Sequence, residues 1–373
     1  MKLAHLADTH LGLRQLHYTL DGGRNTREQD IYNAFERAVD KIIELRPDAV
    51  VHSGDLFDGF HPSNTAIAVA FDQFKRLEEE GISTVVIAGN HSTPRVAAVD
   101  HVFGLLDRLG CVHAVHAQPE VVEIGELAVT AIPHCNDPGQ LREWLTDAKP
   151  SATHRFNVLV GHLGLDGLGR VGASEAGHIA LSGETLEEVA GFTYIALGHL
   201  HQFDRPRINA VYAGSLERVT WTDDTRRKGV VEVDLAADPL DERYVTLHPI
   251  ENRRFLTLPE VNASQTANLT AAIVAAAERD DIAGAIVKLP IRDVPVEIYG
   301  AIDRRAIAKA FKLCLHLELD PEFVDATSAG LHSGAPQELR DFLATRVPRG
   351  VEPAKFIGRA EAYMTKAAEE IGA

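Results

Sequence analysis

Apolar residues in the first part of the chain alternate between short runs and longer stretches with helical spacing. Runs favour strands and spaced stretches favour helices, because strand side chains repeat every two residues and helix faces every three to four. The predicted strands and helices are, in order, 2–7, 28–45 (helix), 48–52, 63–80 (helix), 82–88 and 95–109 (helix). Thr26 and Gln29 have the spacing of a capping box at the first helix.

After residue 110 strand-like runs dominate, namely 111–115, 121–124, 127–132, 157–160, 193–197, 208–213 and 229–235. Helices alternating with strands, followed by many strands, predict α/β layers around one or two mixed sheets. Apolar periodicity lapses at 239–254, which predicts a domain boundary. A small α+β unit is expected beyond it, with helices at 264–279 and 298–313 and strands at 284–290 and 315–319.

The end of the chain has a different pattern. Residues 347–353 have the composition of a hinge, and 354–371 have the spacing of an amphipathic helix. We therefore expect a first domain at 1–245, a second at 254–340, and a hinge with a terminal helix at 347–373.

The composition is that of an ordinary globular protein, with 45% hydrophobic and 24% charged residues among 373. That length predicts two domains, possibly three. No stretch approaches the length of a membrane span, and Asp8 and His10 interrupt the place where a signal peptide needs its apolar run. Three widely spaced cysteines argue against a disulfide framework, so a reducing cytoplasm is expected.

Charge and histidine content restrict the function further. A formal net charge of −17 argues against a protein that coats nucleic acid through a basic surface. Of the 18 histidines, 15 lie at or before His201. Because histidine is a common metal ligand and acid–base group, the first 200 residues are where chemistry is expected.

Five short polar signatures follow one another along that region, four of them directly after an apolar strand. They are Asp8-Thr9-His10, Gly54-Asp55-Leu56-Phe57-Asp58, Gly89-Asn90-His91, Gly161-His162 and Gly198-His199-Leu200-His201. Strand residues i and i+2 share a face, and the glycines allow sharp turns and close backbone approach. Ligands from the ends of several strands can therefore converge at one place.

The donors are oxygens and imidazoles without thiolates, a set that suits Mn²⁺, Fe²⁺ or Zn²⁺ better than Ca²⁺. Seven ligands are too many for one tetrahedral ion, but they suit two ions that share a carboxylate. Asp8 and Asp55 bring two negative charges and two dications bring four positive ones, so about two positive charges remain. Such a site attracts a phosphodiester into an acidic protein.

Together the five signatures resemble those of the calcineurin-like metallophosphoesterase superfamily. Within it, DTHLG, SGDLFD, GNHS, YIALGHLHQ and the YAGSLERVTW segment at 212–221 resemble the SbcD nuclease family, the bacterial counterpart of the meiotic-recombination-eleven nuclease. The similarity covers residues 1–235 by motif and the second domain by layout. It implies a four-layer sandwich, two mixed β-sheets flanked by helices, with a smaller α+β domain that caps DNA.

The resemblance also implies a Mn²⁺-dependent DNA nuclease with two ions per chain. The first ion would be held by Asp8, His10, Asp55 and His201. The second would be held by Asp55, Asn90, His162 and His199. His91 would be the catalytic residue that contacts the scissile phosphate and assists the leaving oxygen. The expected activities are double-strand exonuclease and single-strand or hairpin endonuclease in DNA repair and recombination.

One position departs from the family's pattern. Ser92 follows the GNH motif where the family usually has Asp, which orients the histidine. A weaker hydrogen bond to His91 is therefore expected. Asp58 is expected to support the ligands or to cap a helix rather than to bind metal.

Four polar loop residues are candidates for DNA contacts: His17, Arg24, Arg27 and Arg170. The first three follow the first strand, and the fourth lies in the glycine-rich loop 164–177. A solvated loop is the alternative for both segments. The densest basic cluster, at 226–228, is expected to be solvated as well.

Partners follow from the same resemblance. Helices 63–80 and 95–109 either pack on the sheet or form a homodimer interface with twofold symmetry. The helix at 354–371 either docks on its own chain or binds the coiled-coil root of an SbcC ATPase. The chain has no Walker A pattern, so any ATP dependence requires that partner.

Two other function classes stay open at this point. Another two-metal phosphoesterase, acting on a nucleotide or a phosphoprotein, would use the same ligands, although YAGSLER and the second domain argue against it. A non-catalytic metallophosphoesterase scaffold would usually have lost ligands, whereas all seven are present here.

Overall fold

The computed structural model describes residues 1–20, 23–93, 101–165, 180–181, 189–223 and 227–324. The chain forms two compact units. The first unit comprises Met1–Leu258, Ala277–Lys288 and Ala310–Glu318, and the second comprises Pro259–Ala276, Leu289–Lys309 and the residues from Leu319 onward. The terminal segment 347–373 and residues 325–340 of the expected second domain lie outside the described residues.

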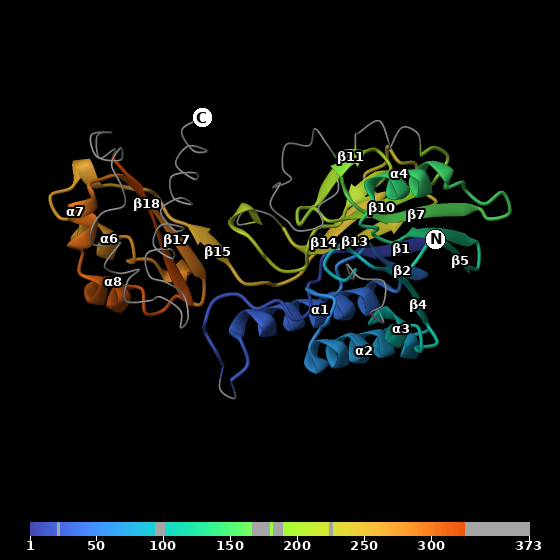
Figure 1. The fold of residues 1–373 in the computed structure, drawn as a ribbon, viewed down its shortest axis with the longest axis horizontal. Helices are drawn as coiled ribbons and strands as arrows, with labels where there is room; N and C mark the ends of the chain where they lie inside the picture. The colour runs from blue at the N-terminus through green and yellow to red at the C-terminus, as the bar shows by residue number, and fades with distance from the viewer. Residues whose placement is uncertain (21–22, 94–100, 166–179, 182–188, 224–226, 325–373) are drawn as a thin grey trace, which may run out of the picture. The chain divides into compact units, whose positions relative to one another are not determined.

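Two six-stranded mixed sheets form the first unit (Figure 1). The first sheet has the order β14-β13-β1-β2-β3-β4, with bounds Val245–Pro249, Gly229–Asp234, Lys2–Leu6, Ala49–His52, Ser83–Ile87 and Val112–Val115. The second has the order β11-β12-β10-β7-β6-β5, with bounds Asp204–Arg207, Ala210–Tyr212, Tyr194–Gly198, Phe156–His162, Leu127–Ile132 and Glu120–Ile124. The central strands of each sheet run parallel, so their carboxyl ends meet at one edge.

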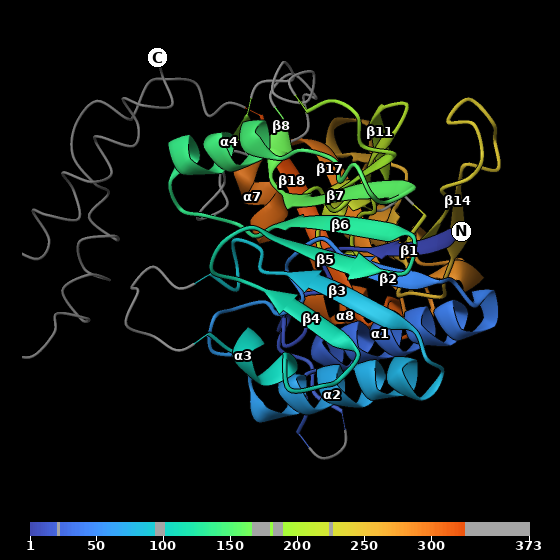
Figure 2. The same cartoon turned by 90° about the vertical axis from the view of Figure 1, so that its right-hand side faces the viewer.

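Helices cover the outer faces of both sheets. Helices α1 (Thr26–Leu45), α2 (Asn64–Glu79) and α3 (Phe103–Leu106) lie on the first sheet, and α4 (Pro138–Asp147) lies on the second (Figures 1 and 2). The order from side to side is helices, sheet, sheet, helix. The expected four-layer α/β sandwich with mixed sheets is therefore confirmed.

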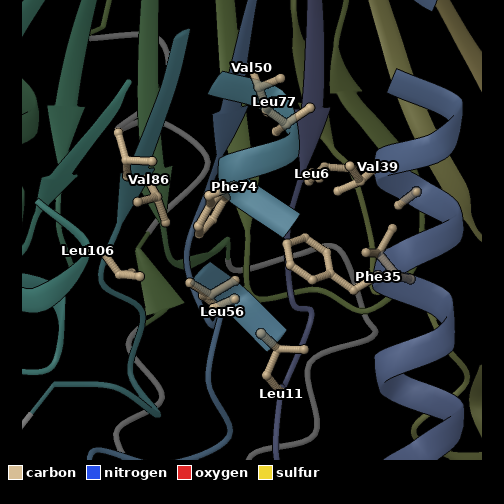
Figure 3. Packing of buried hydrophobic residues seen from close by; sticks show 14 of the residues in the cluster. Leu6, Leu11, Phe35, Val39, Val50, Leu56, Phe74, Leu77, Val86 and Leu106 are labelled. Atoms are coloured by element: carbon tan, nitrogen blue, oxygen red, sulfur yellow. The ribbon is translucent and has the colours of Figure 1, made fainter. Parts of the chain in front are cut away.

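Three apolar clusters separate these layers. Leu6, Phe35 and Phe74 belong to the cluster between the helices and the first sheet, where the two phenylalanine rings pack edge to face at 5.8 Å (Figure 3). A second cluster, including Leu3 and Val158, fills the space between the sheets. A third lies under α4. Central strands buried on both faces read as continuous apolar runs, which is why they were predictable.

A smaller four-stranded sheet follows, in which β15 (Phe255–Thr257), β16 (Val261–Asn262) and β18 (His316–Phe323) each pair with β17 (Ile286–Val294). Its helices are α6 (Leu269–Ala275), α7 (Val296–Gly300) and α8 (Arg304–Ala310). The prediction of a single helix at 298–313 is wrong. The structure has two helices there, because the side chain of Asp303 accepts the backbone N–H groups of Arg305 and Ala306 and so starts a new helix. The expected helix at 264–279 is shorter than predicted.

The remaining elements are small. Strands β8 (Gly164–Leu165) and β9 (Ala180–Leu181) pair with each other. Single 3₁₀ turns occupy Trp221–Asp223, Ala263–Gln265 and Asp280–Ile282. No helix in the described ranges is long and apolar enough to cross a membrane. The three cysteines are free thiols.

Four elements of the first unit differ from the sequence-based prediction. The segment 239–254, where apolar periodicity lapses, contains strand β14. This strand lies at the edge of the sheet and is only half-buried, so it lacks apolar alternation. Edge strand β11 and helix α4 were not predicted, although Asp137 and Pro138 are a recognisable helix start. Of the helix expected at 95–109, residues 95–100 lie outside the described ranges and α3 covers four of the others.

The start of α1 also differs from its prediction. Asn25, rather than Thr26, caps the helix: its side-chain oxygen accepts the N–H groups of Arg27 and Glu28 at 3.0 and 3.1 Å. Replacing Asn25 by alanine is expected to lower the free energy of unfolding by about 1 kcal/mol, because two helix N–H groups lose their acceptor. Chemical denaturation measures this, and Asn25→Asp, which keeps the acceptor oxygen, is the matched control. Equal stability of Asn25→Ala and the parent chain would contradict the assignment.

Candidate metal centre

The five polar signatures lie at the carboxyl ends of five parallel strands. β1, β2 and β3 are neighbours in the first sheet, and β7 and β10 are neighbours in the second. The loops after β1 and β2 are held together by backbone hydrogen bonds, from Asp8 N–H to Gly54 O at 3.0 Å and from His10 N–H to Asp55 O at 2.9 Å. Both sheets therefore deliver polar side chains to one place.

Side chains from these loops form three groups whose ligand atoms all lie within 4.8 Å of one another. The groups are Asp8 with His10 and His201, His10 with Asp55 and His91, and Asp8 with Asp55 and His162. Asp8, His10 and Asp55 each belong to two groups. A carboxylate shared between groups is the arrangement that two adjacent cations require.

Asn90 and His199 complete the set. The Asn90 carbonyl oxygen lies 2.8 Å from Nε2 of His162 and 3.1 Å from Nδ1 of His199. Nε2 of His162 is also 3.2 Å from the Asp55 carboxylate. The structure thus gathers all seven expected metal ligands, and the second expected ligand set clusters around Asn90.

Close packing at this place depends on two glycines. A Cβ on Gly89 would lie 2.2 Å from Oδ1 of Asp55, and a Cβ on Gly198 would lie 1.9 Å from the carbonyl oxygen of Ser53. Neither distance is possible for a real side chain. These two glycines are therefore needed for the strand ends to approach each other.

The ligand candidates themselves have unusual backbone conformations. Asp8, His10, Asp55 and His199 have φ values of 50°, 52°, 51° and 95°, in the left-handed region that side chains disfavour. Each such residue costs about 1–3 kcal/mol and persists only where its surroundings enforce it. Four in one cluster indicate that the fold stabilises this geometry at the expense of local strain.

Hydrogen bonds on the far side of the imidazoles set their tautomers. Nδ1 of His162 donates to the carbonyl of Ser53 at 2.8 Å, and Nδ1 of His10 donates to the carboxylate of Asp58 at 3.2 Å. When each ring carries only its Nδ1 proton, as a metal ligand does, the lone pair of Nε2 points into the cluster. Protein metal sites orient histidine ligands in this way.

The Nε2 atoms of His10 and His201 lie only 3.1 Å apart. Two lone pairs at that distance repel unless a proton or a cation lies between them. Burial and the neighbouring His10 hold the pKa of His201 well below its usual value. The ring is therefore neutral and can offer the lone pair of Nε2 to a metal ion. The pair therefore fits a shared divalent cation.

The carboxylates make the cluster attractive to positive charge. Burial opposes the protonated form of His162, but Asp55 outweighs it and raises the pKa to about 9. Burial also opposes the ionised form of Asp55, yet His162 and His10 outweigh it and hold the pKa well below its usual value. Protons on the imidazoles thus occupy places where a dication would bind and displace them. The donor set and its charge both fit divalent metal ions.

The side chain of His91 is 29% exposed, whereas His10, His162 and His199 are buried. Its backbone N–H donates to Oδ1 of Asp55 at 2.9 Å, and Nδ1 donates to the carbonyl of Asp58 at 3.1 Å. The carboxylate of Asp58 is 3.7 Å from the same nitrogen. Nδ1 of His91 is therefore engaged by Asp58, which leaves Nε2 as the ring nitrogen available to a substrate or ligand.

The orientation of His91 comes from Asp58 rather than from the residue that follows it. Ser92 is 1% exposed, and its hydroxyl has no hydrogen-bond partner among the described residues. Asp58 contacts both histidines: its carboxylate accepts from the metal-ligand candidate His10, and its backbone carbonyl accepts from the catalytic candidate His91. The expectation that Asp58 supports the ligands agrees with these contacts.

The four residues expected to contact DNA differ in their positions. His17 and Arg24 are exposed and line a cavity of about 570 Å³, together with Arg14. Arg27 corrects the prediction: it is 1% exposed, bound to Asp30 at 2.7 Å and to the carbonyl of Arg218 at 2.5 Å, so its guanidinium supports the fold. Arg170 lies outside the described residues.

Lys228 is a second correction. It was expected to be solvated with its basic neighbours, but it is buried beneath His201. Neither Lys228 nor Arg14 was singled out from the sequence as a site residue. For Lys228 the missed signal is its position directly before the apolar strand β13, where the first residues of a central strand are buried.

The fold and this cluster together define a metallophosphoesterase. The chain matches the family model described as Calcineurin-like phosphoesterase over residues 1–203, more than half of its length, and it belongs to that family. Among curated proteins, it is 30% identical over 285 residues to the DNA double-strand break repair protein Mre11 of Methanocaldococcus jannaschii, covering 73% of this chain and 72% of that protein.

Two further Mre11 proteins show similar identity. The chain is 31% identical over 233 residues to that of Sulfurisphaera tokodaii, covering 62% of this chain and 56% of the relative. It is 31% identical over 268 residues to that of Thermoplasma acidophilum, covering 66% of this chain and 65% of the relative. This chain is thus a phosphoesterase homologous to Mre11, and the match spans only part of these relatives' length.

Proposed function

We propose that this chain is the nuclease subunit of a DNA repair complex, of the SbcD and Mre11 kind. It degrades double-stranded ends as an exonuclease and cuts single strands and hairpins as an endonuclease. The observation that carries the proposal is the convergence of seven ligand candidates and His91 at the ends of five strands. Homology to proteins named for DNA double-strand break repair supports DNA as the substrate.

Two Mn²⁺ ions are the proposed cofactors. Asp8, His10, Asp55 and His201 would hold one ion, and Asp55, Asn90, His162 and His199 would hold the other. Such a pair supplies positive charge at a phosphoryl group and lowers the pKa of a water molecule. Oxygen and imidazole donors without thiolates suit Mn²⁺.

His91 is the proposed general acid. Because Nδ1 is committed to the carbonyl of Asp58, Nε2 is the atom that can deliver a proton to the leaving oxygen. The partial exposure of the ring lets Nε2 reach a substrate from outside the cluster. The backbone carbonyl of Asp58 holds the ring in that orientation, and its carboxylate lies 3.7 Å from Nδ1.

The cavity beside the first strand is the proposed DNA-strand contact. His17, Arg24 and Arg14 bring cationic or proton-donating groups to it, while Glu28 and Gln29 hold the two guanidinium groups at 2.9 and 2.5 Å. Guanidinium groups held in place bind phosphate at low entropic cost. Arg170 remains a proposed contact from the loop after His162.

Assembly is also part of the proposal. Leu105 of α3 is 41% exposed, and Ile67, Val69 and Phe71 of α2 are only partly buried, which supports a homodimer through these helices. Light scattering of the purified chain tests the dimer.

Two other parts of the chain have proposed partners. The second domain is proposed to cap DNA, and residues 347–373 are proposed to bind an SbcC ATPase in the cytoplasm.

The deciding experiment is a cleavage assay on end-labelled duplex and hairpin DNA. We expect cleavage with Mn²⁺, little with Mg²⁺ and none with a chelator, and stimulation by SbcC with ATP. A nucleotide and a phosphopeptide are tested in parallel. Faster turnover of either would favour a different two-metal phosphoesterase, and inactivity on all substrates with two bound ions would favour a scaffold.

Replacing Asp58 by asparagine is expected to slow DNA cleavage by about ten- to a hundredfold. The amide keeps the shape of the side chain but removes the negative charge that lies 3.2 Å from Nδ1 of His10 and 3.7 Å from Nδ1 of His91. Single-turnover rates measure the effect, with circular dichroism to confirm the fold. Cleavage at the parent rate would contradict the role of Asp58.

A further inference from the structure

A buried lysine lies directly behind the ligand candidate His201. Lys228, the residue before β13, is 2% exposed. Its ammonium donates to the carbonyl of His201 at 2.5 Å, to Oγ of Ser215 at 2.9 Å and to the carboxylate of Asp223 at 2.8 Å. All three ammonium protons therefore have acceptors, as a cation without water requires.

The carbonyl of His201 is the point where these contacts meet. It also accepts the backbone N–H of Ser215 at 3.1 Å. The hydroxyl of Ser215 accepts from Lys228 and donates to the carbonyl of Glu217 at 2.7 Å. The loop with the GSLER residues, 214–218, is thus hydrogen-bonded to the backbone of the ligand candidate His201.

Asp223 extends the connection. One oxygen of its fully buried carboxylate accepts from Lys228, and the other accepts the backbone N–H groups of Val219 and Thr220, each at 3.1 Å. Lys228 therefore joins residue 201, the loop 215–223 and the start of β13. These three segments are otherwise separate in the sequence.

Stability alone is a weak reason for this arrangement. Removing two charges from water costs several kcal/mol, and replacing a buried ion pair by apolar residues is often neutral or stabilising. A positioning role explains it better, because the direction of an imidazole follows from the orientation of its own peptide. The ring of His201 must keep Nε2 within 3.1 Å of Nε2 of His10.

We infer that Lys228 is a positioning residue for the metal ion held by His201. Its ammonium fixes the His201 carbonyl and thereby the direction of the imidazole, while Asp223 balances its charge. This inference rests on the proposed metal centre. It assigns to the basic residue at 228 a task in metal binding rather than in contacting DNA.

The test is Mn²⁺ binding to metal-free protein, measured by calorimetry and by electron paramagnetic resonance. In Lys228→Met, which keeps the length of the side chain without its donors, the ion at His201 is expected to bind about ten- to a hundredfold more weakly. The other ion should be retained, so the spectrum of a coupled ion pair gives way to that of a single ion. Lys149→Met, an exposed lysine at the end of α4, should bind both ions normally.

A second variant separates metal binding from folding. Lys228→Met leaves Asp223 buried and unpaired, whereas Lys228→Met with Asp223→Asn leaves neither charge. The double variant is expected to regain the melting temperature of the parent chain and still bind the ion at His201 weakly. Normal binding of both ions by the folded double variant would overturn the role of Lys228 alone. A parent chain that binds no ion pair would overturn the proposed metal centre, and this inference with it.

Discussion

Replacing Asp55 by alanine is expected to leave the chain with neither metal ion and without phosphodiester cleavage. Its carboxylate belongs to two of the three ligand groups, one with His10 and His91 and one with Asp8 and His162. In the proposed assignment, removing it takes a ligand from both ions and also the negative charge that attracts them. Losing the metals removes several kcal/mol of transition-state stabilisation, which corresponds to about a thousandfold or more in rate.

Metal content per chain and the cleavage rate measure this together. Asp55 also accepts the backbone N–H of His91, so alanine can disturb the loop as well. Asp55→Asn preserves that acceptor and is expected to lose metal with the fold intact by circular dichroism. Asp147→Ala, at an exposed position on α4, is the matched control. Two ions retained in Asp55→Asn would refute a shared carboxylate.

Replacing His91 by alanine is expected to abolish cleavage while leaving metal binding intact. The ring lies at the edge of the cluster, with Nδ1 held by Asp58 and Nε2 free to face a substrate. Loss of a general acid typically costs about a hundredfold to ten-thousandfold. The ions lose no ligand in the proposed assignment, so their affinity should stay within a few fold.

Metal binding must be measured as well as cleavage, because a ring nitrogen of His91 lies within 4.8 Å of ligand atoms of His10 and Asp55. His91 is therefore a candidate metal ligand as well as a candidate general acid. Calorimetry on His91→Ala distinguishes the two roles. A loss of metal equal to that in Asp55→Asn would make His91 a ligand. His61→Ala, an exposed histidine next to the same loop, should change neither property.

Much of the fold could be read from the sequence because the central strands are buried on both faces. Lys2–Leu6, Ala49–His52 and Ser83–Ile87 were predicted within two residues at each end. Prediction was wrong or silent where burial is partial. Edge strand Val245–Pro249 has no apolar alternation. The apolar spacing at 298–313 predicted one helix, but the Asp303 side chain caps a second helix within this range.

The sequence by itself determined the ligand types and their order, because each signature sits where an apolar strand ends and polar backbone turns begin. Tertiary structure alone decided which groups meet. His10 and His201 are 191 residues apart and their ring nitrogens touch, while Arg27 and Lys228, alike in charge to solvated neighbours, lie buried. Charge and local pattern describe a residue's chemistry, but burial depends on which distant segments pack over it. For that reason the contacts of Asp58 with His91 and of Lys228 with His201 are seen only in the folded chain.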